Sequence, residues 1–159
     1  MQTQVIRAGR SEIALLRALF EQIEMESQPA NTKAREMAAT GFDNSLARFD
    51  FLASDSFWIL VGLIGGQPVG YATLVRMPKA DARVAALYLD ELHVLKTHRR
   101  RGVASALLDE VTVIAKEVGA WRIRLLVSPH NQAARNLYRS LGFSEVEEIL
   151  CEKTPEEDV

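Results

Sequence analysis

The sequence predicts a mixed α/β fold, with a central, mostly antiparallel twisted sheet flanked by about four helices. Two apolar runs meet at Gly65-Gly66, a dipeptide typical of a β-hairpin turn. A helix-period apolar pattern from Val103 to Val118 lies between two further strand-like runs. Such a crossover predicts a pair of parallel strands within the sheet. The length of 159 residues favours a single domain over residues 1–159.

The first half of the chain is expected to supply an edge strand, two helices and the hairpin. Ser11 is a plausible N-cap of the first helix, which Pro29 ends. The expected elements are a strand at Gln4–Ala8, a helix with Ile13, Leu16, Phe20 and Ile23 on one face, an irregular helical region at Asn31–Ala53, and hairpin strands at Phe57–Val61 and Val69–Val75.

The second half should alternate strands and helices. The helix that starts near Val103 should stop at Gly119, and a later one at Gly142. The other expected elements are strands at Val84–Val94, Ile123–Val127 and Val146–Lys153 and a helix at Asn131–Leu141.

The composition excludes several functional classes. The 19 Lys and Arg against 21 Asp and Glu leave a net charge of −2, which gives no global attraction to nucleic acid. Cys151 is the only cysteine, so neither an internal disulfide nor a Cys-rich zinc site can form; we expect it to pack among apolar residues and expect no metal. The longest apolar run, 57–65, is far shorter than the ~20 residues of a membrane span, and the N-terminus lacks a signal-peptide pattern. We therefore expect a cytoplasmic protein without a membrane partner.

A basic loop precedes the helix at Val103 and has the features of an anion site. The first amides of a helix lack internal partners, and the helix dipole favours negative charge there. Gly102, Ala104 and Ser105 leave the backbone accessible, and the arginines Arg99, Arg100 and Arg101 add charge-assisted hydrogen bonds. The alternative is an ordinary basic surface loop.

This segment resembles the pyrophosphate loop of the GNAT superfamily of acyl-CoA-dependent N-acetyltransferases. The family loop reads Gln/Arg-x-x-Gly-x-Gly/Ala, which Arg99-Arg100-Arg101-Gly102-Val103-Ala104 fits. The preceding strand ends in Leu92-His93-Val94, as in that family. A second family pattern follows at Asn131-x-x-Ala134-x-x-Leu137-Tyr138-x-x-x-Gly142-Phe143. The resemblance covers about the whole domain, although the first sixty residues match in layout rather than in motif.

The resemblance implies that acetyl-CoA is the co-substrate and that its pantetheine arm lies between two splayed parallel strands. Asn131 would contact the pantetheine, cap the helix, or do both. Arg135 would contact the 3′-phosphate or simply be solvated. The cofactor-binding residues implied in this way are Leu92, His93, Val94, Arg99, Arg100, Arg101, Gly102, Val103, Ala104, Ser105, Asn131 and Arg135.

The resemblance also implies the catalytic residues. Tyr138 would protonate the departing thiolate, because a tyrosine of ordinary pKa holds its proton at neutral pH. An acid before Leu92 would take the proton from the amine. Adjacent residues of a regular strand point to opposite faces, so only one of Asp90 and Glu91 can face the acceptor. We prefer Glu91, with Asp90 as the alternative, because the resemblance includes aminoglycoside 3-N-acetyltransferases, which have an acidic residue at this position.

The function implied is transfer of an acetyl group from acetyl-CoA to a primary amine by direct attack in a ternary complex. The acceptor would be a small cationic molecule that resembles a polyamine, an amino acid or an aminoglycoside. The alternatives are a protein amine as acceptor, or a non-catalytic acyl-CoA sensor. Dimers are common in the family, so a homodimer is possible.

Overall fold

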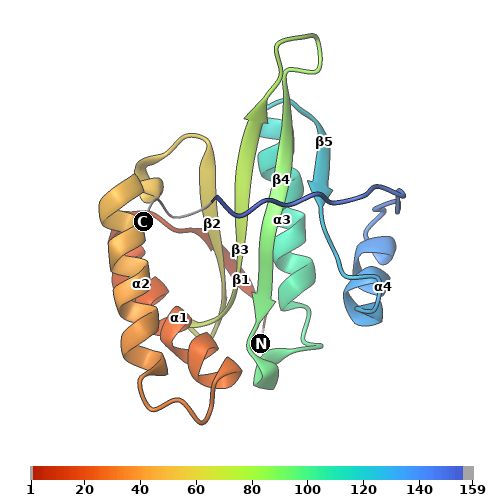
Figure 1. The fold of residues 1–159 in the computed structure, drawn as a ribbon. Helices are drawn as coiled ribbons and strands as arrows, with labels where there is room; N and C mark the ends of the chain where they lie inside the picture. Colours follow the sequence, from red (N-terminus) through yellow and green to blue (C-terminus); the bar gives the residue numbers. More distant parts are fainter. Residues whose placement is uncertain (1, 156–159) are drawn as a thin grey trace. The chain divides into compact units, whose positions relative to one another are not determined.

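A five-stranded sheet organises the fold of residues 2–155, which the computed structural model describes. The strands follow one another across the sheet in chain order, and Figure 1 shows them side by side. The first four pair antiparallel, and the last two pair parallel. The predicted mixed, mostly antiparallel sheet is therefore confirmed. The strands are β1 (Gln4–Arg7), β2 (Phe57–Ile64), β3 (Gln67–Pro78), β4 (Ala85–Val94) and β5 (Ala120–Leu125).

The described chain separates into two compact units, residues 2–126 and 127–155. The first unit holds the sheet and three helices: α1 (Ile13–Ser27), α2 (Ala34–Phe49) and α3 (Val103–Glu117). Alternating side chains of β2 face opposite ways. Ile59 and Val61 pack in one core cluster with Leu16, Leu19 and Phe42 of α1 and α2. The other face of the sheet belongs to α3, whose Val103, Leu107, Val111 and Ile114 are buried.

Two glycines let neighbouring elements approach closely. A Cβ at Gly62 in β2 would lie 2.9 Å from the Val103 side chain of α3, and a Cβ at Gly70 in β3 would lie 2.7 Å from the carbonyl oxygen of His93 in β4. Gly62 and Gly70 are also paired with each other. The absence of these two side chains therefore lets the start of α3 lie close to β2 and the end of β4 lie close to β3.

The strand β4 changes character halfway along its length. Leu89 pairs with Leu74 and Glu91 pairs with Thr73, which leaves Asp90 as the extra residue of a β-bulge. Pairing with β5 stops at Leu89. The second half of β4 thus pairs with β3 on one side and lies beyond Leu125, the last residue of β5, on the other.

The second unit contains α4 (Gln132–Ser140). The Asn131 side chain accepts a hydrogen bond from the amide of Ala134 at 3.2 Å, so it is the N-cap of this helix. The helix is closed by Gly142, whose φ of +85° lies in the left-handed region that favours glycine.

Three local expectations are wrong. Residues 146–153 have no regular secondary structure; Ile149 is 90% exposed, so this apolar pattern has no sheet neighbour to form a ladder with. The side chain of Cys151 is exposed rather than packed. Ser11 lies within a short 3₁₀ turn, where its hydroxyl donates to Glu12, and is not the N-cap of α1.

No helix within residues 2–155 is long and apolar enough to cross a bilayer.

Candidate active site

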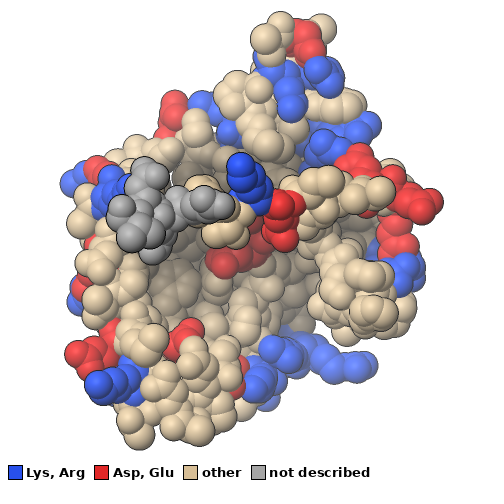
Figure 2. All heavy atoms as spheres, viewed as in Figure 1, with Lys and Arg blue, Asp and Glu red and all other residues tan. Residues whose placement is uncertain are grey.

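The basic loop lies between the end of β4 and the start of α3. Its backbone turns through two left-handed residues, Arg100 at φ +60° and Gly102 at φ +81°. Gly102 occupies the N-cap position of α3, and no side chain among the described residues caps that end of the helix with a hydrogen bond. The first amides of α3 therefore remain available, and Figure 2 shows Lys and Arg side chains gathered at the lower end of β4, where Figure 1 places this loop. Val103 is buried, whereas Arg99, Arg100, Arg101 and Gly102 are exposed and Ala104 and Ser105 are half-buried.

Three hydrogen bonds connect this loop to neighbouring elements. The Arg99 Nε donates to the carbonyl oxygen of Val94 at 3.1 Å. The amide of Lys96 donates to the carboxylate of Glu26 at 3.1 Å, and its Nζ donates to the Glu26 carbonyl oxygen at 2.9 Å. The loop is thus tied to the end of β4 and to the last turn of α1.

The second half of β4 presents backbone groups to its open edge. The amide of Leu95 donates to the Val69 carbonyl oxygen at 2.9 Å, so the main chain of Leu95 faces β3. Backbone groups alternate in direction along a strand, which turns those of His93 towards β3 and those of Leu92 and Val94 away from it. An extended ligand could pair with this edge as an added strand does.

The two candidate acids lie at the bulge. The Tyr71 hydroxyl of β3 donates to Glu91 Oε2 at 3.0 Å, and the Glu91 amide donates to Thr73 Oγ1 at 3.1 Å. The charge of Asp90 also acts on Tyr71: burial, the neighbouring Glu91 and then Asp90 raise the pKa of the Tyr71 hydroxyl well above its usual range. The bulge interrupts the regular alternation from which we reasoned that only one acid could face the acceptor, so that argument no longer separates Asp90 from Glu91.

His93 adds a titratable group beside these acids. It lies two residues beyond Glu91 with no further register shift, and its ring stacks on that of Tyr71 at a centroid distance of 6.3 Å. Its buried Nε2 has no hydrogen-bond partner among the described residues. Burial and the charge of Arg99 lower the pKa of His93, which favours the neutral imidazole.

Sequence reasoning missed Tyr71 and Thr73. Both occupy an apolar strand pattern in which a tyrosine or threonine is ordinary. Their role depends on the register of β3 against β4, and register is a long-range property that no local motif carries.

The second unit carries the other predicted residues. The ring of Tyr138 packs edge-to-face on Phe143 at 5.6 Å, and burial raises the pKa of its hydroxyl. Arg135 makes a two-pronged ion pair with Glu145 at 2.8 Å and also donates to the Pro129 carbonyl oxygen at 2.9 Å. The Arg135 guanidinium thus has partners inside its own unit, an arrangement that neither alternative from the sequence included.

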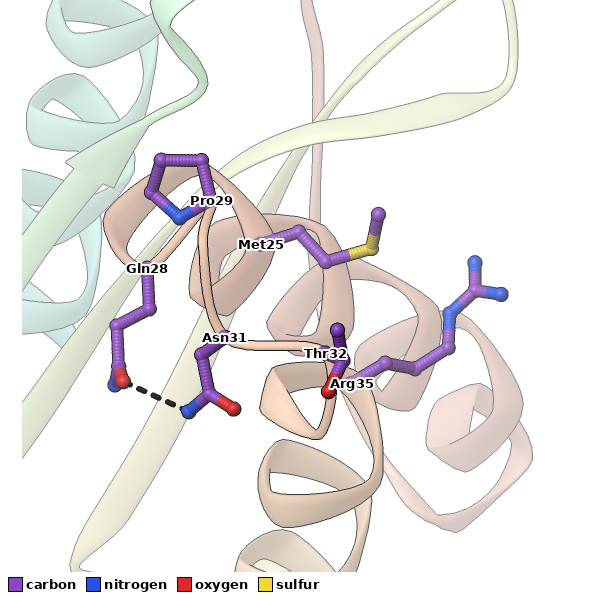
Figure 3. A pocket seen from close by; sticks show the side chains of 6 residues that line it. All are labelled: Met25, Gln28, Pro29, Asn31, Thr32 and Arg35. Carbon is purple, nitrogen blue, oxygen red and sulfur yellow. Dashed lines mark hydrogen bonds between the residues drawn. The ribbon is translucent and has the colours of Figure 1, made fainter.

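A hollow of about 450 Å³ lies at the turn between α1 and α2 (Figure 3). Its lining mixes apolar side chains with amide, hydroxyl and guanidinium groups, and Gln28 accepts a hydrogen bond from Asn31 at 3.0 Å. The residues lining the hollow are Met25, Gln28, Pro29, Asn31, Thr32 and Arg35.

Within residues 2–155, no group of three or more His, Cys, Asp or Glu side chains is arranged to hold a metal.

Comparison with known proteins adds an independent line of evidence. The model of the Acetyltransferase (GNAT) family matches residues 20–143. An uncharacterised N-acetyltransferase of Mycobacterium tuberculosis is 36% identical over 100 residues, which are 62% of this chain and 61% of that protein. The match thus spans about three fifths of the length of this curated relative.

Solved structures share the fold over nearly the entire chain. An aminoglycoside acetyltransferase from an uncultured soil metagenomic sample is 26% identical, covers 99% of this chain and 100% of its own, and has a TM-score of 0.80. An aminoglycoside N-acetyltransferase solved in complex with CoA is 17% identical with a TM-score of 0.72, over 96% of this chain and 95% of its own. The latter likeness shows the fold alone.

Proposed function

Because the chain belongs to the Acetyltransferase (GNAT) family, we propose that it is an acetyl-CoA-dependent N-acetyltransferase, built as one domain over residues 1–159, that acts on a primary amine. The observation that carries the proposal is the open half of β4, which leads through the basic loop to the start of α3, where no described side chain caps the first amides. An extended amide-bearing arm ending in a pyrophosphate matches both parts of this surface: one offers backbone pairing and the other offers free amides and cationic side chains.

The proposed division of labour follows the chemistry of each group. Acetyl-CoA supplies the activated thioester carbonyl. The amides of residues 100–104 and the side chains of Arg99, Arg100 and Arg101 bind the phosphates, while Leu92 and Val94 offer main-chain groups to the pantetheine amides. Glu91, with Asp90 as the alternative, accepts the proton of the attacking amine, and Tyr138 donates a proton to the thiolate.

A small cationic amine is the acceptor that we favour. Asp90 and Glu91 form an exposed pair of carboxylates at the bulge, which would attract a protonated amine before one of them accepts its proton. The similarity to an aminoglycoside acetyltransferase at 26% identity supports a polyamine-like, amino acid-like or aminoglycoside-like molecule over a protein amine. The pair of acids also favours an enzyme over a non-catalytic acyl-CoA sensor, which would have no use for a base.

Titration calorimetry with acetyl-CoA tests the cofactor. We expect saturable binding that weakens when Arg100 and Arg101 are both replaced by Gln. A double replacement of Arg10 and Arg48, which are also exposed arginines outside the loop, is the matched control. Absence of binding to the wild-type protein would overturn the proposal.

Thiol release over a panel of amines tests the acceptor. The panel contains polyamines, amino acids, aminoglycosides and a lysine peptide, and we expect turnover to be fastest with a small cationic member. Replacement of Tyr138 by Phe should lower turnover with that amine while acetyl-CoA binding persists. Unchanged turnover would remove Tyr138 from the mechanism, and preference for the peptide would favour the protein acceptor.

A further inference from the structure

We propose that Tyr71 is a positioning residue that holds one carboxylate oxygen of Glu91 so that the other stays directed to the acceptor amine. The proposal rests on the proposed function, because it assigns Glu91 a proton to accept. Tyr71 itself need not touch the amine; it acts through Glu91.

The contact is specific at the level of single atoms. The Tyr71 hydroxyl donates to Oε2 of Glu91 at 3.0 Å, and this leaves Oε1 free of that contact. The Glu91 main chain is fixed independently, because its amide donates to Thr73 Oγ1 at 3.1 Å. Thr73 is 5% exposed, so this bond is shielded from water. Two residues of β3 therefore fix the acid at both ends, one through its backbone and one through its side chain.

Tyr71 is itself immobilised. Its ring is buried, with 8% exposed, and Phe20 of α1 packs edge-to-face on it at 5.0 Å. His93 stacks on it at 6.3 Å. Packing of the ring fixes the position of the hydroxyl oxygen, so the O–H can donate to Glu91 from one place without movement of the ring.

The protonation state of Tyr71 suits this role. Burial and the neighbouring carboxylates raise the pKa of its hydroxyl, so the group keeps its proton throughout the working pH range. A tyrosine held in this state donates to Glu91 continuously and does not compete for the proton of the amine. A hydrogen bond that fixes a catalytic group in place matters because small misplacements of reacting groups cost large factors in rate.

The test is a double-mutant cycle on turnover. Tyr71→Phe keeps the ring and removes the hydroxyl, and we expect kcat to fall roughly tenfold with KM for the amine changed less than twofold. In a Glu91→Gln background, the same replacement should change kcat less than twofold, because the hydroxyl acts only through Glu91. Tyr88→Phe, which removes a hydroxyl from the half of β4 before the bulge, is the matched control and should leave kcat unchanged.

The outcomes separate this proposal from the proposed function. Losses that multiply in the double variant, or an unchanged kcat in Tyr71→Phe while Glu91→Gln is impaired, would overturn the role of Tyr71 and leave the acetyltransferase intact. A wild-type protein with no turnover on any amine would instead overturn the proposed function. Thr73→Val provides a second variant that removes the backbone anchor, and a kcat fall without a KM change is expected there too. Thermal unfolding of each variant confirms that it is folded.

Discussion

The two halves of β4 form one continuous strand and yet obey different constraints. In the first half, from Ala85 to Leu89, the strand pairs on both sides, and Leu87 and Leu89 are almost fully buried. In the second half, from Asp90 to Val94, it pairs with β3 alone and no side chain is fully buried. Buried apolar side chains therefore stabilise the first half, whereas the second half is held by hydrogen bonds to β3 and has an edge without a β5 partner.

Of the ten residues of β4, the first five therefore contribute mainly to stability, and the last five include the residues of the proposed reaction. Apolar side chains in the first half need only fill the space between their neighbours, because the hydrophobic effect that stabilises them is non-directional. Glu91 in the second half needs a particular partner at a particular atom. Substitutions in the two halves should therefore fail in different ways.

The largest effect is expected from removing the acid. Glu91→Gln keeps the shape of the side chain and abolishes its capacity to accept a proton, so kcat should fall by about 10²- to 10³-fold with the best amine of the panel. Steady-state kinetics and a thermal melt measure this together, and the melting temperature should hardly move. A larger loss in Asp90→Asn than in Glu91→Gln would transfer the role of base to Asp90.

A core substitution in the first half should show the opposite signature. Leu87 is 0% exposed, and Leu87→Ala should lower the free energy of unfolding by about 2–5 kcal/mol through lost burial and a residual cavity. Urea denaturation measures that loss. The folded fraction should keep most of its kcat; a kcat loss as large as that of Glu91→Gln would break the distinction between the halves.

A smaller effect is expected just beyond β4. Gly102→Ala places a Cβ on a residue with φ +81°, where the surrounding space is open but the backbone is strained for L-residues by about 1–2 kcal/mol. We expect acetyl-CoA binding to weaken by about five- to tenfold as the loop shifts to relieve that strain. Calorimetry checks this against Gly41→Ala, a helical glycine with equally open space and no positive φ, which should bind acetyl-CoA normally.

The smallest effect is a pH dependence confined to the second half. Burial and then Arg99 lower the pKa of His93 below 6.5 in the folded protein, so protonation opposes folding. The contribution of this residue to stability is complete above pH 6.5 and is lost as the pH falls from 6.5 through the lower folded pKa. Melting temperatures of wild type and His93→Gln between pH 5 and 8 should diverge in slope below pH 6.5, and parallel curves would contradict this origin.

Much of this organisation was accessible from the sequence. The helical periodicity predicted α3, the Gly65-Gly66 dipeptide predicted the hairpin, and the two motifs predicted the family, because each of these signals lies within a short stretch of sequence. The Asn131 cap was also predicted as one of two roles and is confirmed. By contrast, β5 begins at Ala120, three residues before the predicted start at Ile123. The prediction was late because Trp121 and Arg122 look like surface residues in the sequence, and both are exposed although they belong to the strand.

What remained inaccessible depends on pairing between distant segments. The bulge at Asp90 exists because of how β3 and β4 align, and Tyr71 meets Glu91 across twenty residues of sequence. The strand predicted at residues 146–153 fails for the same reason: alternation indicates what a strand would look like but supplies no neighbour. The roles of Tyr138, Asn131 and Arg135 towards acetyl-CoA stay predictions from the resemblance.

The bulge has a consequence for how this strand can change. With strict alternation, Glu91 would follow Leu87 and Leu89 onto the face that α3 covers, and its carboxylate would have to enter an apolar core at a cost of several kcal/mol. One unpaired residue resets the phase, so that Glu91 joins Tyr71 and Thr73 on the opposite face. A substitution on one side of position 90 therefore need not affect the side chains on the other side. One extra residue separates the part of β4 whose side chains form the core from the part whose side chains form the proposed active site.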